Sequence, residues 1–331
     1  MPSRRVMLRK CGRSAAIATA IVSVAVGAVA CARGAATGAS KAARPLGATT
    51  GSVTEPLPRS TLRRLPPGVF YMLWGVTGAE DNLWELSSRG LVERQLTHNP
   101  RGYEIDSFAA SRAGIILSDA LYNEDLLARW TTHGVQWMRP AGRKTGYVRG
   151  FDPDIRPNGQ IAYLTPSNAI WLRRSFSAQP KIVYRYPKNY YPGSPTFGPH
   201  GQIAIVPPSY LAATQKPTVV IVSEAGTVRF LDTGYSRMGY PTAWGQTAAA
   251  LVIPPFRGPE KLFFPDGSSE QLPGGWKALS WNPDGSKLLV ISRTSLGMWS
   301  RSSPGRINII GPVNRPPEVI QASWLNASAR S

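Results

Sequence analysis

The sequence predicts an all-β fold, a six-bladed β-propeller built from four-stranded blades. A turn-and-strand pattern recurs six times at intervals of 37 to 47 residues, and the last copy breaks off at the end of the chain. A period of about this length, made only of short strands, is typical of propeller blades. Since one blade cannot bury both of its faces alone, the copies must stack around a ring.

The clearest copy begins at Trp281 and continues as Asn-Pro-Asp-Gly-Ser-Lys before the apolar run Leu288–Val290. The proline presets φ for a turn and the Asp-Gly pair tolerates positive φ, so this copy predicts a hairpin between two strands. The large apolar residue before each turn should end the innermost strand and wedge between neighbouring blades. These anchor residues are Phe108, Ile155, Phe197, Trp244, Trp281 and Trp324.

Each repeat has room for four strands. Around Trp281 we expect them at residues 276–281, 286–292, 296–301 and 306–310. The copies at Ile155 and Phe197 keep a Pro-x-Gly turn, whereas those at Phe108 and Trp244 keep only the anchor and the later apolar run.

The two ends of the repeat region predict how the ring closes. The copy at Trp324 has no room for its second strand, while residues 68–74, 82–86 and 92–97 form three strands with no anchor strand before them. We therefore expect a strand near 318–323 to complete the blade that residues 68–97 begin. Closure of this kind removes the open sheet edges that invite aggregation.

The repeat resembles the TolB-like, WD40-like propeller family, whose blades carry Trp-Ser-Pro-Asp-Gly-Lys before an apolar strand. The stretch at 281–287 is a near match, and Arg-Gln-Leu-Thr at 94–97 is similar to the strand that precedes such a blade. The resemblance covers about residues 68–331. Only one of the six copies is near the consensus, so the chain is a divergent member. What the resemblance implies for function is protein–protein or peptide binding.

Residues 1–31 are predicted to be a bacterial export signal. A basic stretch precedes the small apolar segment Ala15–Ala30, which is too short for a comfortable membrane span. The segment ends Ala-Val-Ala-Cys, which resembles a lipobox, so we expect cleavage before Cys31 and acylation, including palmitate, of its thiol. Cys11 would leave with the signal, so the mature chain can form no internal disulfide.

Anchoring at Cys31 would place the protein on the outer face of the cell membrane; the alternative is ordinary cleavage and free secretion. Ser3–Leu8 resembles a twin-arginine export motif, but it also fits a generic basic segment. Residues 32–66, rich in Ala, Gly, Ser, Thr and Pro, are expected to be a flexible linker. Residues 67–331 would then form a single propeller domain, which we expect to be monomeric.

The chain is strongly basic, with 38 lysine and arginine residues against 19 aspartate and glutamate residues. Such a balance often indicates nucleic-acid binding. Export argues against a nucleic-acid partner and leaves acidic phospholipids and anionic cell-wall polymers as candidates. The excess of arginine over lysine also fits a GC-rich genome, and the charge was expected to be spread over the blades.

The segments that lead into the six innermost strands should lie together on one rim of the ring, here named the connector rim. Five of these six segments carry Tyr or Trp, and all six carry a basic residue. Rigid aromatic contact area and forked arginine hydrogen bonds suit a partner-binding face. The other interpretation is that these aromatics pack between blades. The candidate binding residues are Tyr103, Asp106, Tyr147, Arg149, Tyr191, Arg237, Tyr240, Trp276 and Lys277.

The sequence offers little support for catalysis. The three histidines, His98, His133 and His200, fall in different blades, so we expect no metal site, no histidine-based triad and no cofactor. No nucleophile elbow, phosphate-binding loop or calcium loop occurs. One alternative is an extracellular carbohydrate-active hydrolase or lyase that uses Asp106 and Asp152 at the channel mouth. A third is a binder of anionic cell-wall polymer.

Overall fold

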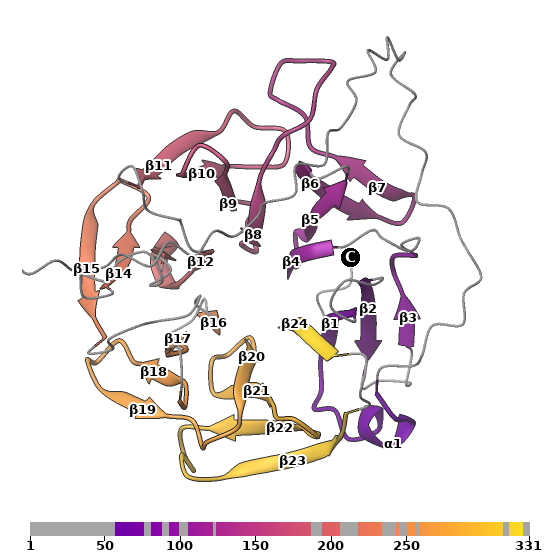
Figure 1. Cartoon of the computed structure of the whole chain (residues 1–331), viewed down its shortest axis with the longest axis vertical. Helices are drawn as coiled ribbons and strands as arrows, with labels where there is room; N and C mark the ends of the chain where they lie inside the picture. The colour runs from indigo at the N-terminus through magenta and orange to yellow at the C-terminus, as the bar shows by residue number, and fades with distance from the viewer. Residues whose placement is uncertain are drawn as a thin grey trace, which may run out of the picture. The chain divides into compact units, whose positions relative to one another are not determined.

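Six four-stranded antiparallel sheets are arranged as the blades of a propeller (Figure 1). The structure is a computed structural model, and it describes residues 57–75, 81–87, 93–98, 105–121, 124–186, 194–205, 218–233, 243–244, 250–255, 258–313 and 318–326. All of these belong to the second of two compact units, 1–43 and 44–331, into which the chain divides. The predicted fold class is confirmed. Within the described residues, no helix is long and apolar enough to cross a membrane.

The first three blades follow one another along the chain, and within each the innermost strand is named first. Blade 1 comprises β24 (Glu318–Leu325), β1 (Val69–Gly75), β2 (Asn82–Ser87) and β3 (Glu93–Gln95). Blade 2 comprises β4 (Ile105–Ser111), β5 (Gly114–Leu121), β6 (Glu124–Thr131) and β7 (Gly134–Trp137). Blade 3 comprises β8 (Phe151–Ile155), β9 (Ile161–Thr165), β10 (Ala169–Arg173) and β11 (Lys181–Arg185).

The other three blades have the same order. Blade 4 comprises β12 (Pro195–Phe197), β13 (Ile203–Ile205), β14 (Thr218–Val222) and β15 (Val228–Asp232), with the short 3-10 helix η1 (Pro199–Gly201) after β12. Blade 5 comprises β16 (Ala243–Trp244), β17 (Leu251–Ile253), β18 (Lys261–Phe263) and β19 (Ser269–Gln271). Blade 6 comprises β20 (Lys277–Trp281), β21 (Lys287–Ile291), β22 (Ser295–Ser300) and β23 (Ile307–Pro312).

The strands of blade 6 lie within two residues of the predicted ones, and local hydrogen bonding explains the turn that joins the first two. The backbone N–H of Asn282 donates to the carbonyl of Lys287 at 2.8 Å, and the N–H of Lys287 donates to Asn282 Oδ1 at 2.9 Å. Gly285 has φ +74°, a conformation that other residues rarely adopt. The Asn-Pro-Asp-Gly sequence thus closes the hairpin with its own side chains and a glycine.

All six anchor residues lie on innermost strands and contribute to the seams between blades. The buried apolar residues of the described chain form six clusters, one for each pair of neighbouring blades. Trp281 of blade 6 belongs to one buried cluster with Val252 and Leu262 of blade 5. The ring of Trp244 lies against Gly198 of blade 4, where a Cβ would come within 2.4 Å of it. The predicted wedging of anchors between blades is confirmed at these seams.

The ring closes as predicted, because β24 pairs with β1 along its length, from Val69 opposite Leu325 to Gly75 opposite Glu318. A short helix, α1 (Arg59–Leu62), covers this seam, and Thr61 Oγ1 donates to the carbonyl of Pro312 at 2.9 Å. The nearby leucines 57, 62 and 65 are buried against blades 6 and 1. The packed part of the chain therefore begins within the segment predicted to be a linker.

Side chains on one innermost strand also bind the backbone of the next. The N–H of Phe108 donates to Gln321 Oε1 at 2.9 Å, and the N–H of Trp324 donates to Ser280 Oγ at 3.0 Å. The N–H of Phe197 donates to Asp154 Oδ2 at 2.6 Å. In all three cases the donor is an anchor residue and the acceptor belongs to the preceding blade. These contacts hold neighbouring innermost strands together where no ladder of backbone hydrogen bonds joins them.

Deleting residues 318–331 is expected to unfold the whole ring rather than one blade. The deletion removes β24 and leaves β1 as an unpaired edge beside an open seam. Near-ultraviolet circular dichroism and gel filtration should show lost tertiary packing and aggregation. A monomer whose melting temperature stays within about 5 °C of the parent would contradict this account of closure.

Candidate functional site

The innermost strands are irregular close to the connector rim. Register shifts interrupt β4 between Ile105 and Ser107, β8 between Phe151 and Asp154, and β20 between Ala278 and Ser280. A bulge of this kind redirects the side chains around the extra residue. Asp106 and Asp152 lie at two of these bulges, so their side chains do not follow the regular alternation between the two faces of a strand.

The structure places five of the predicted binding residues. Asp106, Arg149 and Lys277 are exposed, and Tyr147 is 42% exposed. Trp276 is partly buried between blades 5 and 6, and its ring lies so close to Gly297 that a Cβ there would be 3.1 Å from it. Trp276 therefore fits the packing interpretation. The remaining candidates, Tyr103, Tyr191, Arg237 and Tyr240, and the predicted lipidation site Cys31, lie outside the described residues.

Asp152 lies where three innermost strands approach one another. Burial raises the pKa of its carboxyl above the usual range, and the Asp125 carboxylate raises it further. The hydroxyl groups of Ser194, just before β12, and Ser107, on β4, oppose this shift in pKa. The backbone of Asp152 has φ +49°, in the left-handed region where a residue with a Cβ is strained.

Two further aspartates on blades 2 and 3 have raised pKa values. Burial raises the pKa of Asp154 to about 7, against the lowering effect of its hydrogen bonds from the N–H groups of Phe197 and Ile155. Asp119 on β5 is 2% exposed, and its Oδ1 has no hydrogen-bond partner among the described residues. Burial raises the pKa of Asp119 to about 6. Asp154 is therefore only partly ionised near neutral pH, whereas Asp119 takes up its proton as the pH falls toward 6.

These carboxyl groups do not form an evident catalytic or metal centre. Asp106 is exposed, whereas Asp152 is partly buried beside two serine hydroxyl groups. The described residues contain no group of three or more His, Cys, Asp or Glu residues that could hold a metal ion. The histidines His98, His133 and His200 are all exposed, and they follow β3, β6 and β12 on three different blades.

A loop held at its base by backbone hydrogen bonds leads from blade 2 into blade 3. At its base the N–H of Val148 donates to the carbonyl of Met138 at 2.9 Å, and both residues are hydrogen-bonded to Leu127 of β6. Glycines 142 and 146 turn the chain with φ of +74° and +84°. We name residues 139–147 the seam loop. It presents Arg139, Arg143, Lys144 and Tyr147, all exposed.

Tyr147 at the end of the seam loop packs against the outermost strand of blade 2. Its ring meets that of Trp137 at 6.1 Å, inclined at 62°. Trp137 was not among the predicted binding residues, because it falls at the end of an outer strand and not in a segment that leads into an innermost one. The pair, with Tyr147 exposed and Trp137 partly buried, lies next to Arg139, Arg143 and Lys144 of the same loop.

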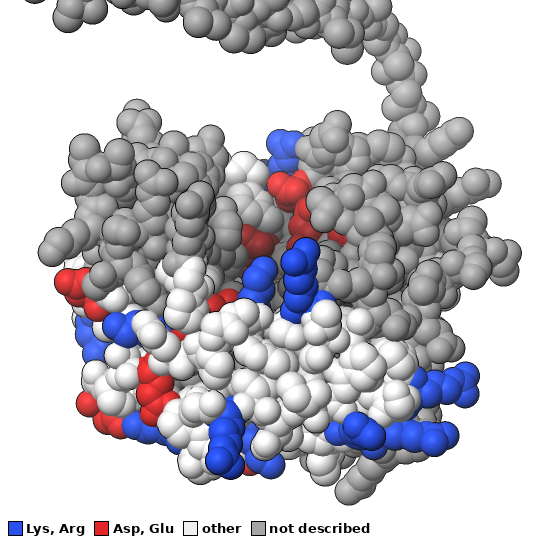
Figure 2. Space-filling model, turned by 60° about the horizontal axis from the view of Figure 1, so that its bottom comes forward, with Lys and Arg blue, Asp and Glu red and all other residues white. Residues whose placement is uncertain are grey.

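On one side of the ring, opposite charges lie close together. Figure 2 shows basic and acidic side chains next to one another on the side that carries blades 5 and 6. There Arg301 forms an ion pair with Asp266 at 2.8 Å. The seam loop differs, since the run from Met138 to Gly150 contains no acidic residue.

The replacement Asp119→Asn is expected to change how stability depends on pH. The carboxyl of Asp119 has its usual pKa of 3.8 when unfolded and about 6 when folded. The folded chain therefore keeps a proton that the unfolded chain loses, and the stability of the wild type falls as pH rises from about 4 to 6. Above pH 7 the variant should be the more stable by about 1–3 kcal/mol, measured by urea unfolding.

The replacement Asp284→Asn is a control, because it should change stability at neutral pH in the opposite direction. The hydrogen bonds from Ser286 lower the pKa of the exposed Asp284 carboxyl, so Asp284→Asn should lose stability at neutral pH, and the loss should shrink as pH falls below the usual range of a carboxyl. An Asp119→Asn effect that stays constant from pH 4 to 8 would rule out a buried carboxyl that titrates near 6.

The sequence matches no protein-family model and no curated protein at a significant level. Among solved structures it is similar to TolB from Acinetobacter baumannii, with 15% identity and a TM-score of 0.57. The match covers 78% of this chain and 66% of the TolB chain, which is just under two thirds of its length. It is also similar to a putative TolB from Agrobacterium tumefaciens, with 13% identity, a TM-score of 0.50, and coverage of 76% and 92%. At these identities the likeness concerns the fold alone. Together with the six blades and their closure, it shows that this chain has the fold of the TolB-like six-bladed β-propellers.

Proposed function

We propose that this chain is a non-catalytic binding module of the cell envelope that recognises a protein or a peptide through its connector rim. The observation that carries the proposal is the seam loop. It is held at its base by backbone hydrogen bonds, and it exposes Tyr147 beside Trp137 and three cations. A preformed loop with a rigid aromatic anchor loses little conformational entropy when a partner binds.

The resemblance of the repeat to TolB-like propellers implies the same kind of function, although a shared fold is a weak warrant for a shared partner. The enzyme alternative has less support. It depends on Asp106 and Asp152, and Asp152 lies against serine hydroxyl groups from two neighbouring blades, where it also fits a structural position. Binding through the seam loop requires no reacting group.

We place the module on the outer face of the cell membrane, held by acyl groups at Cys31. The sequence alone supports this placement, through the basic segment, the apolar stretch and the Ala-Val-Ala-Cys motif. Two acyl chains would make the attachment stable, whereas a single chain anchors a protein only marginally.

Crosslinking and pull-down from intact cells test the binding proposal. The wild type should capture a protein partner. Tyr147→Ala should reduce capture at least about fivefold, because a tyrosine that becomes buried in an interface is a frequent hot spot. Phe230→Ala is the matched control, since Phe230 is an aromatic residue 70% exposed on β15 of blade 4. A partner lost with Phe230→Ala but kept with Tyr147→Ala would place the interface away from the seam loop. In the same cells, Cys31→Ser should release the protein from the membrane fraction.

A further inference from the structure

Positive charge is concentrated in the stretch that runs from the end of blade 2 through blade 3. Residues 129–185 contain ten lysine and arginine residues and only two acidic ones, Asp152 and Asp154. Both acids lie on the innermost strand β8, where burial raises their pKa values. The outer part of this region therefore carries almost only cations. The expectation that charge is spread over the blades does not hold here.

Two arginines from neighbouring blades converge at this seam on Phe176. The guanidinium carbon of Arg129, on β6, lies 4.8 Å from the centre of the Phe176 ring. Arg173, at the end of β10, is 1% exposed, and its Nη1 donates to the carbonyl of Phe176 at 3.1 Å. The same nitrogen donates to the carbonyl of Arg139 at 3.4 Å, so Arg173 also fixes the start of the seam loop.

The partners of these arginines are neutral. Arg173 Nε donates to the hydroxyl of Tyr163 at 3.3 Å, and Arg129 Nη2 donates to Gln136 Oε1 at 2.7 Å. The Nε of Arg129 is buried and has no acceptor among the described residues. A guanidinium removed from water without a counter-ion is costly, and an unused buried donor adds to the cost.

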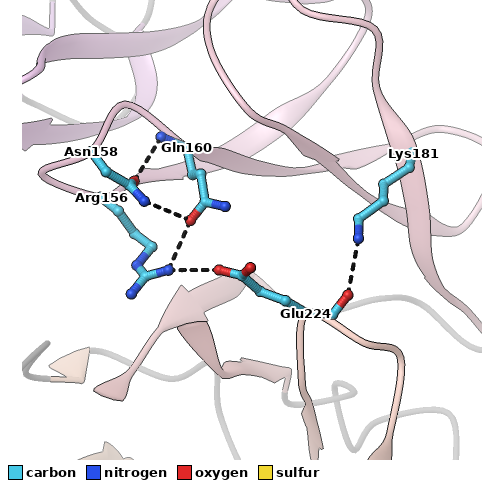
Figure 3. Close-up of polar contacts among 5 residues, drawn as sticks. All are labelled: Arg156, Asn158, Gln160, Lys181 and Glu224. Atoms are coloured by element: carbon cyan, nitrogen blue, oxygen red, sulfur yellow. Dashed lines mark hydrogen bonds and ion pairs between the residues drawn. The ribbon is translucent and has the colours of Figure 1, made fainter. Parts of the chain in front are cut away.

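Three other arginines of the described chain, Arg94, Arg156 and Arg301, form ion pairs with a carboxylate. Figure 3 shows Arg156, which donates to Glu224 Oε1 at 2.8 Å and to Gln160 Oε1 at 2.7 Å, while Lys181 donates to the carbonyl of Glu224 at 2.9 Å. Arg94 is paired with Glu85 at 2.8 Å. By contrast, Arg129, Arg139 and Arg173 make no ion pair with a described acidic residue.

Building on the proposed function, we propose that the seam between blades 2 and 3 binds an acidic polypeptide segment. The guanidinium groups of Arg129 and Arg139, with Arg143 and Lys144 on the seam loop, bind its carboxylates, and the Trp137–Tyr147 pair contacts its apolar side chains. A planar guanidinium matches a carboxylate with two parallel hydrogen bonds. The aromatic pair beside the cations favours a polypeptide over a phosphate-rich polymer, which offers no apolar group.

Fluorescence anisotropy with a labelled acidic peptide tests this inference. The probe is a fluorescein-labelled peptide of about twelve residues built from Glu-Glu-Phe-Gly repeats, titrated with the full-length protein in detergent. Arg143→Gln combined with Lys144→Gln should weaken binding about tenfold, and binding should also weaken as salt is raised. Both residues are exposed, so the variant should keep the near-ultraviolet spectrum of the wild type.

Two controls isolate the seam and the charge. Arg293→Gln combined with Arg306→Gln removes the same charge from exposed positions before and after β22, and it should change the affinity less than about twofold. A probe with every Glu replaced by Gln should not bind. Equal losses in the two double variants, or equal binding of the two probes, would overturn the inference.

The two proposals can fail separately. Inorganic polyphosphate that binds through Arg143 and Lys144 while the acidic peptide does not would assign the seam to an anionic polymer and overturn the inference. A protein partner captured equally by the wild type and the seam variant would overturn the inference alone and leave the proposed function standing. Absence of any captured partner would overturn the proposed function as well.

Discussion

The pairing of β24 with β1 is the constraint on which the other blades depend, because each blade buries its faces only against two neighbours. The six apolar clusters lie between blades, not within them, so one open seam exposes two hydrophobic faces. Hydrogen bonds from anchor N–H groups to Gln321, Asp154 and Ser280 join successive innermost strands around the same ring. The last strand of the chain therefore makes six separate sheets into one structure.

Much of this architecture could be predicted from the sequence, because each blade repeats the same arrangement of four strands. The hairpin at 281–287 needs proline and glycine at fixed places, and the truncated copy at Trp324 leaves a strand that only the first blade can accept. The packing of residues 57–65 was missed, since isolated leucines among prolines and arginines give no periodic signal. Only the neighbouring blades show that these leucines are core residues.

The candidate binding surface was harder to predict, because repeats copy structural residues as readily as binding residues. Trp276 and Tyr147 occupy similar places in the sequence pattern, yet Trp276 packs against Gly297 and Tyr147 is exposed. Trp137, Phe176 and Arg173 carry no motif. The contacts of Phe176 with Arg129 and of Arg173 with the carbonyl of Arg139 form only when blades 2 and 3 lie side by side. The excess of basic residues in 129–185 was the one signal in the sequence that could have located the seam. The contacts between innermost strands hold the blades together, so the residues in the outer part of a seam can differ from one seam to the next.

The central claim is that β24 makes the ring one cooperative unit, and native-state hydrogen exchange of the full-length protein tests it most directly. Amides of Phe70, Met72, Ala322 and Trp324 in blade 1 should exchange with the same free energy of opening as Ala162 and Leu164 of β9, two blades away, because all of them open only on global unfolding. Exchange of β1 and β24 at a free energy several kcal/mol below that of β9 would contradict the account, since it would mean that blade 1 opens while the rest of the propeller stays folded.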